Sequence, residues 1–123
     1  MNGTYFFDSY AFFEILRGNP QYEQYKNNVT MITTKLNLLE LHYWLLIQKS
    51  SEVADYYYFF FEKNTLEFGS ETIKEASRFR ARHRKQKLSY IDCIGYVMAK
   101  SKNAKFLTGD KQFEGMENVE FVK

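Results

Sequence analysis

Short runs of apolar residues alternate along this chain with longer segments in which apolar residues recur every three or four positions. The short runs predict buried strands at about 4–7, 29–33, 65–68, 104–107 and 119–122. The longer pattern predicts helices at about 11–16, 21–26, 36–49, 52–63, 71–85 and 89–100. Strands that alternate with helices are joined by right-handed crossovers, which favours a mainly parallel sheet.

We therefore expect the α/β fold class, as a single three-layer domain over residues 1–123. Its central sheet should be mainly parallel, with four to five strands flanked by helices. The only proline, Pro20, should end the first helix and start a short second one. A chain of 123 residues can bury one core but not two, and no linker or repeat interrupts it.

Composition adds limits on partners and location. Hydrophobic residues make up 45% and charged residues 26% of the chain, as in ordinary soluble domains. The longest apolar-rich stretch, 36–47, is too short for a membrane span and contains Glu40 and His42. One cysteine forms no internal disulfide and favours the cytoplasm. A net charge of +2 means that nucleic-acid binding requires a local basic patch.

Two acidic residues follow predicted strands. Asp8 ends the first run, and Asp110 comes just after the run at 104–107. Asp also fits a turn, where its side chain bonds its own backbone, so a structural role for Asp8 is an alternative. Ligands of open parallel sheets bind at the carboxyl ends of the strands, which places both acids at the edge where a ligand would lie.

Two further acids belong to early turns of helices that begin at this edge. Glu40 lies between Leu36, Trp44 and Ile47 on a helical wheel, where a lone carboxylate is costly unless a cation meets it. Asp92 lies in Ser89-x-x-Asp92, which also matches a capping box, so helix capping is an alternative role.

Four carboxylates at one edge would repel one another and raise each other's pKa. A divalent cation removes this conflict, and an all-oxygen ligand set without His or Cys selects Mg²⁺ or Mn²⁺. The chemistry that fits is hydrolysis of a phosphodiester by a metal-activated water.

These segments together resemble a known family, the PIN-domain nucleases, and in particular the VapC-type toxins of toxin–antitoxin pairs. The resemblance rests on Asp8-Ser9, on Glu40, on Ser89-Tyr90-Ile91-Asp92 and on Thr108-Gly109-Asp110-Lys111-Gln112-Phe113. It implies that Asp8, Glu40, Asp92 and Asp110 are the catalytic and metal-binding acids. It also implies that Ser9 and Thr108 are supporting hydroxyls of the site.

The resemblance further implies function and partners. The activity would be a metal-dependent endoribonuclease acting on tRNA, rRNA or mRNA, with Mg²⁺ or Mn²⁺ as cofactor. A cognate antitoxin protein would fill the active-site groove with its C-terminal segment, and the chain would form a homodimer. A nuclease of RNA maturation and a catalytically inactive RNA- or protein-binding scaffold are the alternatives.

Two positions depart from the family pattern. Gln112 stands where many relatives carry a further acid that would help to bind a second metal ion. Catalysis could therefore use one metal ion, or a second ion could be recruited together with the substrate. Tyr10 follows Ser9, where a small polar residue is more usual, and changes the rim of the predicted pocket.

A basic stretch precedes Asp92 and comprises Arg78, Arg80, Arg82, Arg84, Lys85 and Lys87. Such stretches are often solvated helix faces. Beside an acidic site they can instead hold the RNA backbone, and we expect this of Arg80, Arg84 and Lys87.

Six consecutive aromatic residues, 56–61, cannot all face one core when helical, so part of them should form an interface. We expect a helix of the antitoxin to pack against this aromatic surface, and stacking of RNA bases on the tyrosines is the alternative use. A thiol nucleophile at Cys93, with His42 or His83, is disfavoured because burial beside Asp92 would raise the thiol pKa.

Overall fold

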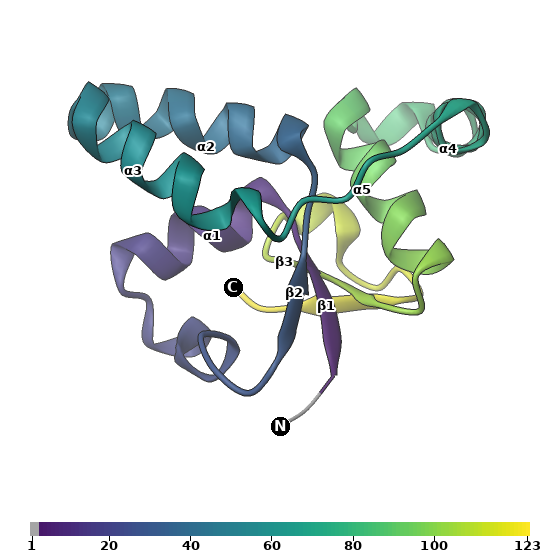
Figure 1. Cartoon of the computed structure of the whole chain (residues 1–123). Coiled ribbons are helices and arrows are strands. Elements are labelled where there is room, and N and C mark those ends of the chain that lie inside the picture. Colours follow the sequence, from purple (N-terminus) through teal and green to yellow (C-terminus); the bar gives the residue numbers. More distant parts are fainter. Residues whose placement is uncertain (1–2) are drawn as a thin grey trace.

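The computed structural model describes residues 3–123 and contains a four-stranded, all-parallel sheet in the order β2-β1-β3-β4 (Figure 1). The strands are β1 (Thr4–Phe7), β2 (Thr30–Ile32), β3 (Lys105–Thr108) and β4 (Val119–Phe121). The α-helices are α1 (Ser9–Arg17), α2 (Lys35–Gln48), α3 (Ser51–Glu62), α4 (Ser70–Arg82) and α5 (Tyr90–Ser101). Three 3₁₀ segments are η1 (Pro20–Tyr25), η2 (Arg84–Gln86) and η3 (Lys111–Phe113). The predicted three-layer α/β class is confirmed.

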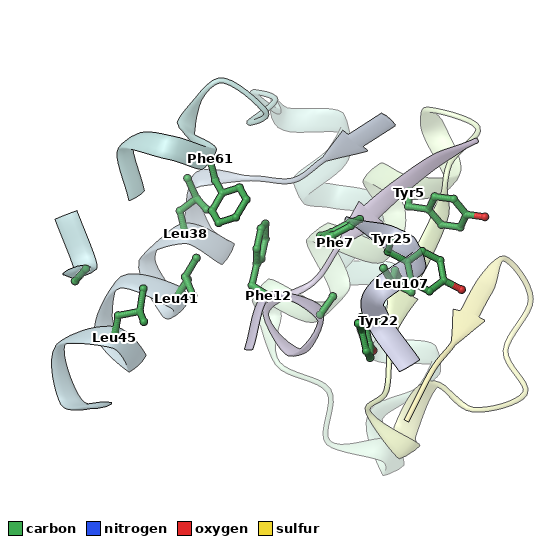
Figure 2. Close-up of a cluster of buried hydrophobic side chains, with 12 residues drawn as sticks. Tyr5, Phe7, Phe12, Tyr22, Tyr25, Leu38, Leu41, Leu45, Phe61 and Leu107 are labelled. Atoms are coloured by element: carbon green, nitrogen blue, oxygen red, sulfur yellow. The ribbon is translucent and has the colours of Figure 1, made fainter. Parts of the chain in front are cut away.

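Two hydrophobic clusters cover the two faces of the sheet, because successive residues of a strand point to opposite faces. Phe7 points into the cluster built with α1, α2 and α3, where Phe12, Leu38 and Phe61 pack (Figure 2). Phe6 points into the other cluster, with Phe106 and residues of α4 and α5. The central strand β1 is therefore buried on both sides, which explains its unbroken apolar sequence.

Three helices begin at the carboxyl edge of the sheet, each with a capping side chain at its start. Asp8 caps α1 and accepts the Ala11 N–H at 3.0 Å. Thr34 caps α2 and Ser89 caps α5. A cap satisfies helix N–H groups that have no partner within the helix, so these polar residues locate the helix starts.

One predicted strand is wrong. Residues 65–68 form only an isolated bridge, Thr33 with Thr65, supported by the Leu66 N–H donating to the Thr33 carbonyl at 2.9 Å. The physical reason is the neighbouring segment: β2 ends at Ile32 and α2 begins at Lys35, so little extended chain remains to pair with. The sheet consequently has four strands over the described residues.

Two helix predictions need correction at their ends. The helix expected at 71–85 stops at Arg82, where the His83 N–H bonds the carbonyls of both Phe79 and Arg80 and tightens the last turn. Lys87 then adopts a left-handed φ of 55°, and this turn directs the chain into α5. The segment expected as a helix at 21–26 is the 3₁₀ segment η1, which starts at Pro20.

Within residues 3–123, none of the helices combines the length and the apolar character that crossing a membrane requires.

Candidate active site

Asp8 and Asp110 lie at the ends of the two central strands. The pairing of β1 with β3 sets Phe7 beside Leu107, so the residues that follow, Asp8 and Thr108, are neighbours. The Thr108 hydroxyl bonds the Asp8 carboxylate and also accepts the Asp110 N–H at 3.0 Å. Thr108 is itself fully buried and thus connects the two acids.

Asp8 is the most deeply buried of the four acids, with only 3% of its surface exposed. Burial raises the pKa of its carboxyl to about 8, and the carboxylates of Asp92 and Asp110 add to this increase. The hydrogen bonds from Thr108 and Ala11 act in the opposite direction. Asp8 therefore carries a negative charge at neutral pH only at a substantial cost in free energy.

Asp92 lies in the first turn of α5 and fulfils the capping box. Its Oδ2 accepts the Ser89 N–H at 3.0 Å, and the Ser89 hydroxyl accepts the Asp92 N–H at 3.0 Å. Asp92 therefore caps the helix, as the alternative predicts, and the same residue also interacts with the other acids of the site. Burial and the carboxylate of Asp110 raise the pKa of Asp92.

Glu40 reaches the same region from α2. Burial raises the pKa of its carboxyl and the carboxylate of Asp92 raises it further, whereas a hydrogen bond from the Ser9 hydroxyl lowers it. Electrostatic effects connect the four acids: Asp92 and Asp110 raise the pKa of Asp8, Asp110 raises that of Asp92, and Asp92 raises that of Glu40. The structure therefore brings the four predicted acids into one electrostatic cluster.

Two polar residues behind Ser9 were missed by the sequence argument. Asn37 is 2% exposed, and its amide donates to the Ser9 hydroxyl at 3.2 Å. The Thr34 hydroxyl in turn donates to the Asn37 carbonyl oxygen at 2.7 Å. The available signal was the spacing of Thr34, Asn37 and Glu40, because residues three apart share a face at the start of a helix.

No cationic side chain in the described part of the chain forms an ion pair with the cluster. The ion pairs found among residues 3–123 involve other acids, namely Glu14, Glu23, Asp55, Glu62, Glu71, Glu75 and Glu117. Within this described part, no three acidic, His or Cys side chains converge on one point closely enough to hold a metal ion. Even so, one buried and three partly buried carboxylates, unpaired with a cation among residues 3–123, form an oxygen-only ligand set that fits a hard divalent ion.

The two departures from the family pattern form part of the rim. The Tyr10 ring packs so closely on Gly109 that an added Cβ there would lie 2.4 Å from it, and 2.3 Å from the Val122 carbonyl. Gly109 is thus required by this close approach. Gln112 is exposed, and its N–H donates to the Asp110 carboxylate at 3.0 Å, so its backbone contacts the acid while its side chain supplies no charge.

The basic stretch divides into separate groups. Arg78 and Arg82 both pair with Glu75, at 3.2 and 3.3 Å. Arg80 donates to the Leu88 carbonyl at 2.9 Å, and its guanidinium lies 4.3 Å from the ring centre of Tyr90.

Arg84 and Lys87 are exposed in the segment that leads into α5, five and two residues before its capping residue Ser89. They are placed near the start of the helix that carries Asp92. Arg80, by contrast, has a clear structural role in joining α4 to α5.

An apolar groove of about 770 Å³ borders Glu40. Its walls come from α1, α2 and α5 and comprise Phe13, Leu39, Tyr43, Trp44, Ile47 and Ile91. Leu39, Tyr43 and Ile47 are each more than half exposed. A hydrophobic segment of a partner could therefore lie beside the acidic cluster without a rearrangement of the fold.

The aromatic residues 56–61 divide as expected between core and surface. Phe61 is buried, whereas Tyr56, Phe59 and Phe60 are 59%, 78% and 47% exposed. The exposed three form an aromatic face on α3.

The thiol alternative does not fit the structure. Cys93 is buried, and burial followed by the Asp92 carboxylate raises the pKa of its thiol to about 11. His42 bonds Asp55 at 2.7 Å, and His83 bonds the Phe79 carbonyl at 3.0 Å. The thiol is therefore protonated at neutral pH, and both histidines are engaged elsewhere.

The family model of the PIN domain matches residues 5–119, and this chain therefore belongs to the PIN-domain family. No curated protein is significantly similar in sequence.

Solved structures share the fold at low sequence identity. VapC20 of Mycobacterium tuberculosis, a sarcin–ricin loop cleaving toxin, is 13% identical with a TM-score of 0.75, over 94% of this chain and 98% of that one. VapBC-1 of nontypeable Haemophilus influenzae is 15% identical with a TM-score of 0.74, over 98% and 97%. A toxin–antitoxin complex of Klebsiella pneumoniae is 14% identical with a TM-score of 0.73, over 94% of both chains. At these identities the likeness establishes the fold.

Proposed function

We propose that this chain is a divalent-metal-dependent endoribonuclease and the toxin of a VapBC-type pair. The observation that carries the proposal is the acidic cluster of Asp8, Glu40, Asp92 and Asp110, supplied by four elements and unpaired with any cation among residues 3–123. The burial of the Asp8 carboxyl beside other acids would be unfavourable for the fold alone. A bound divalent cation offsets that cost, so the cluster is explained by cation binding and not by a contribution to the stability of the fold.

The residues divide into roles. The four acids would hold Mg²⁺ or Mn²⁺, and such an ion, when bound, activates water and stabilises the charge that develops on a phosphodiester. Ser9 and Thr108 orient the carboxylates of Glu40 and Asp8 through their hydroxyl groups. Arg84 and Lys87 bind the RNA backbone near the cluster, because phosphates would otherwise be repelled by it.

A cognate antitoxin is the proposed protein partner. Support comes from the structural likeness to a toxin–antitoxin complex and from the apolar groove beside Glu40. A hydrophobic antitoxin segment in this groove would block approach of RNA to the cluster.

The testing experiment is cleavage of a mixture of total tRNA and rRNA by purified wild type and Asp8→Asn, each with Mg²⁺, Mn²⁺ or EDTA. The expected result is discrete fragments that require both the metal and Asp8. The substitution keeps the side-chain size, so circular dichroism of the variant should match wild type. Cleavage that persists in EDTA or in the variant would contradict the metal mechanism, and no cleavage by folded wild type would favour the inactive scaffold.

A further inference from the structure

We propose that Asn37 is a positioning residue of the acidic cluster. Its side-chain amide orients the Ser9 hydroxyl so that the hydroxyl donates its hydrogen bond to the Glu40 carboxylate. The inference rests on the proposed function and extends it to a residue that does not itself belong to the cluster. The carrying observation is a chain of hydrogen bonds from Thr34 through Asn37 and Ser9 to Glu40.

The direction of each bond in this chain is determined by the groups available. The Thr34 hydroxyl oxygen accepts the backbone N–H of Asn37 at 3.2 Å. The same hydroxyl donates a hydrogen bond to the side-chain oxygen of Asn37, Oδ1, at 2.7 Å. The Asn37 amide nitrogen, which can only donate, therefore faces Ser9. Because the Ser9 oxygen accepts from this amide at 3.2 Å, its single proton is directed to Glu40.

Burial supports a specific role for this amide. Asn37 is 2% exposed, and it belongs to a helix whose Leu38 and Leu41 are buried as well. A buried amide costs free energy unless it is hydrogen-bonded, and an apolar residue of the same size would fill this place without that cost. The capping of α2 does not require it, since the Thr34 hydroxyl already accepts the Asn37 backbone N–H.

The consequence concerns the geometry of Glu40. Groups behind a metal ligand set its orientation, and their loss typically weakens metal affinity by about 10- to 100-fold. Without the amide, the Ser9 hydroxyl can rotate and its proton is no longer directed to Glu40. Metal affinity should therefore fall although all four acids are intact.

The test measures Mn²⁺ binding by isothermal titration calorimetry on EDTA-treated, buffer-exchanged protein. The variants are Asn37→Leu, Ser9→Ala and the double variant. Asn64→Leu is the control, because Asn64 is partly buried and its amide donates to the Met31 carbonyl at 3.1 Å, outside the chain of hydrogen bonds from Thr34 to Glu40. If Asn37→Leu gives no folded protein by circular dichroism, Asn37→Ala replaces it.

The expected result is about tenfold weaker Mn²⁺ binding in Asn37→Leu and in Ser9→Ala, with no further loss in the double variant, and wild-type affinity in Asn64→Leu. Non-additivity is expected because both substitutions interrupt the same chain of hydrogen bonds. Wild-type affinity in Asn37→Leu, or losses that multiply in the double variant, would overturn this inference alone. Absence of Mn²⁺ binding by wild type would overturn the proposed function and this inference with it.

Discussion

Asp8 combines two roles that the sequence presents as alternatives. Its carboxylate caps α1 through the Ala11 N–H, as a turn residue would, and it lies buried against Thr108 as part of the acidic cluster. The helix N-terminus favours its negative charge, whereas burial and the neighbouring acids oppose it. Its pKa of about 8 shows that the opposing effects prevail in the metal-free protein.

The stability of the metal-free protein should therefore depend on Asp8 in a defined pH range. Below about pH 4 the carboxyl is protonated in both the folded and the unfolded chain. Between about pH 4 and 8 the unfolded chain loses this proton while the folded chain keeps it, so stability falls by about 1.4 kcal/mol per pH unit relative to a variant without the group. Urea unfolding of wild type and Asp8→Asn across this range measures the difference.

Metal addition provides the control for this pH effect. At pH 8, Mn²⁺ should raise the melting temperature of wild type and leave that of Asp8→Asn nearly unchanged, because a ligand that binds only the folded state stabilises it. Wild type and variant with parallel pH profiles would contradict the assigned cost of Asp8.

Helix α5 shows how an element is positioned by packing. Gly95 faces the sheet, where an added Cβ would lie 2.8 Å from the Phe6 ring and 3.1 Å from the Phe106 ring. The close approach of α5 to β1 and β3 brings the start of the helix, with Asp92, to the strand ends. Glycine at this position therefore serves packing and not backbone flexibility.

Substitution Gly95→Ala should destabilise the fold by about 1–3 kcal/mol, since an extra methyl in a close-packed core forces its neighbours apart. Urea unfolding measures the effect. Gly69→Ala is the matched control, because an added Cβ there meets open space and should cost less. Equal losses in the two variants would mean that α5 does not depend on this close contact.

At the scale of the whole molecule, charge and apolar surface are distributed unevenly. The net charge is only +2, yet Arg84 and Lys87 are exposed near the start of α5. The aromatic face of α3, formed by Tyr56, Phe59 and Phe60, is exposed as well. A basic region near an acidic site and a separate apolar face are suited to two different partners, RNA and protein.

Reversal of charge in the double variant Arg84→Glu, Lys87→Glu should weaken RNA binding and reduce the salt slope of the logarithm of affinity by about 2. Fluorescence anisotropy with tRNA in EDTA, over a series of salt concentrations, measures the slope. Lys102→Glu is the control, because Lys102 caps the far end of α5 and is exposed. An unchanged slope in the double variant would remove these residues from the RNA-binding surface.

The aromatic face of α3 should mediate a homodimer, since exposed aromatic side chains gain free energy when they are buried in an interface. We expect sedimentation velocity to show a dimer for wild type and a monomer for Phe59→Glu. Ile73→Glu, on the exposed part of α4, introduces the same charge on a 52% exposed apolar residue and should leave the dimer intact. A wild type that is monomeric at high concentration would contradict the interface.

The sequence by itself determined the order of strands and helices and the positions of the four acids along it. Periodicity is a local property, and in a parallel sheet the order of elements already places strand ends and helix starts at one edge. The helix ends and the 65–68 segment could not be read in this way, because they depend on neighbours such as Lys87 and Thr33.

Only the tertiary structure decided how the site is supported. The depth of Asp8, the link from Asn37 to Ser9 across 28 positions of the chain, and the pairing of Arg78 and Arg82 with Glu75 depend on which side chains meet after folding. The physical reason is that burial and hydrogen-bond direction are set by contacts between distant segments, whereas the pattern along the chain records only which face of an element is apolar.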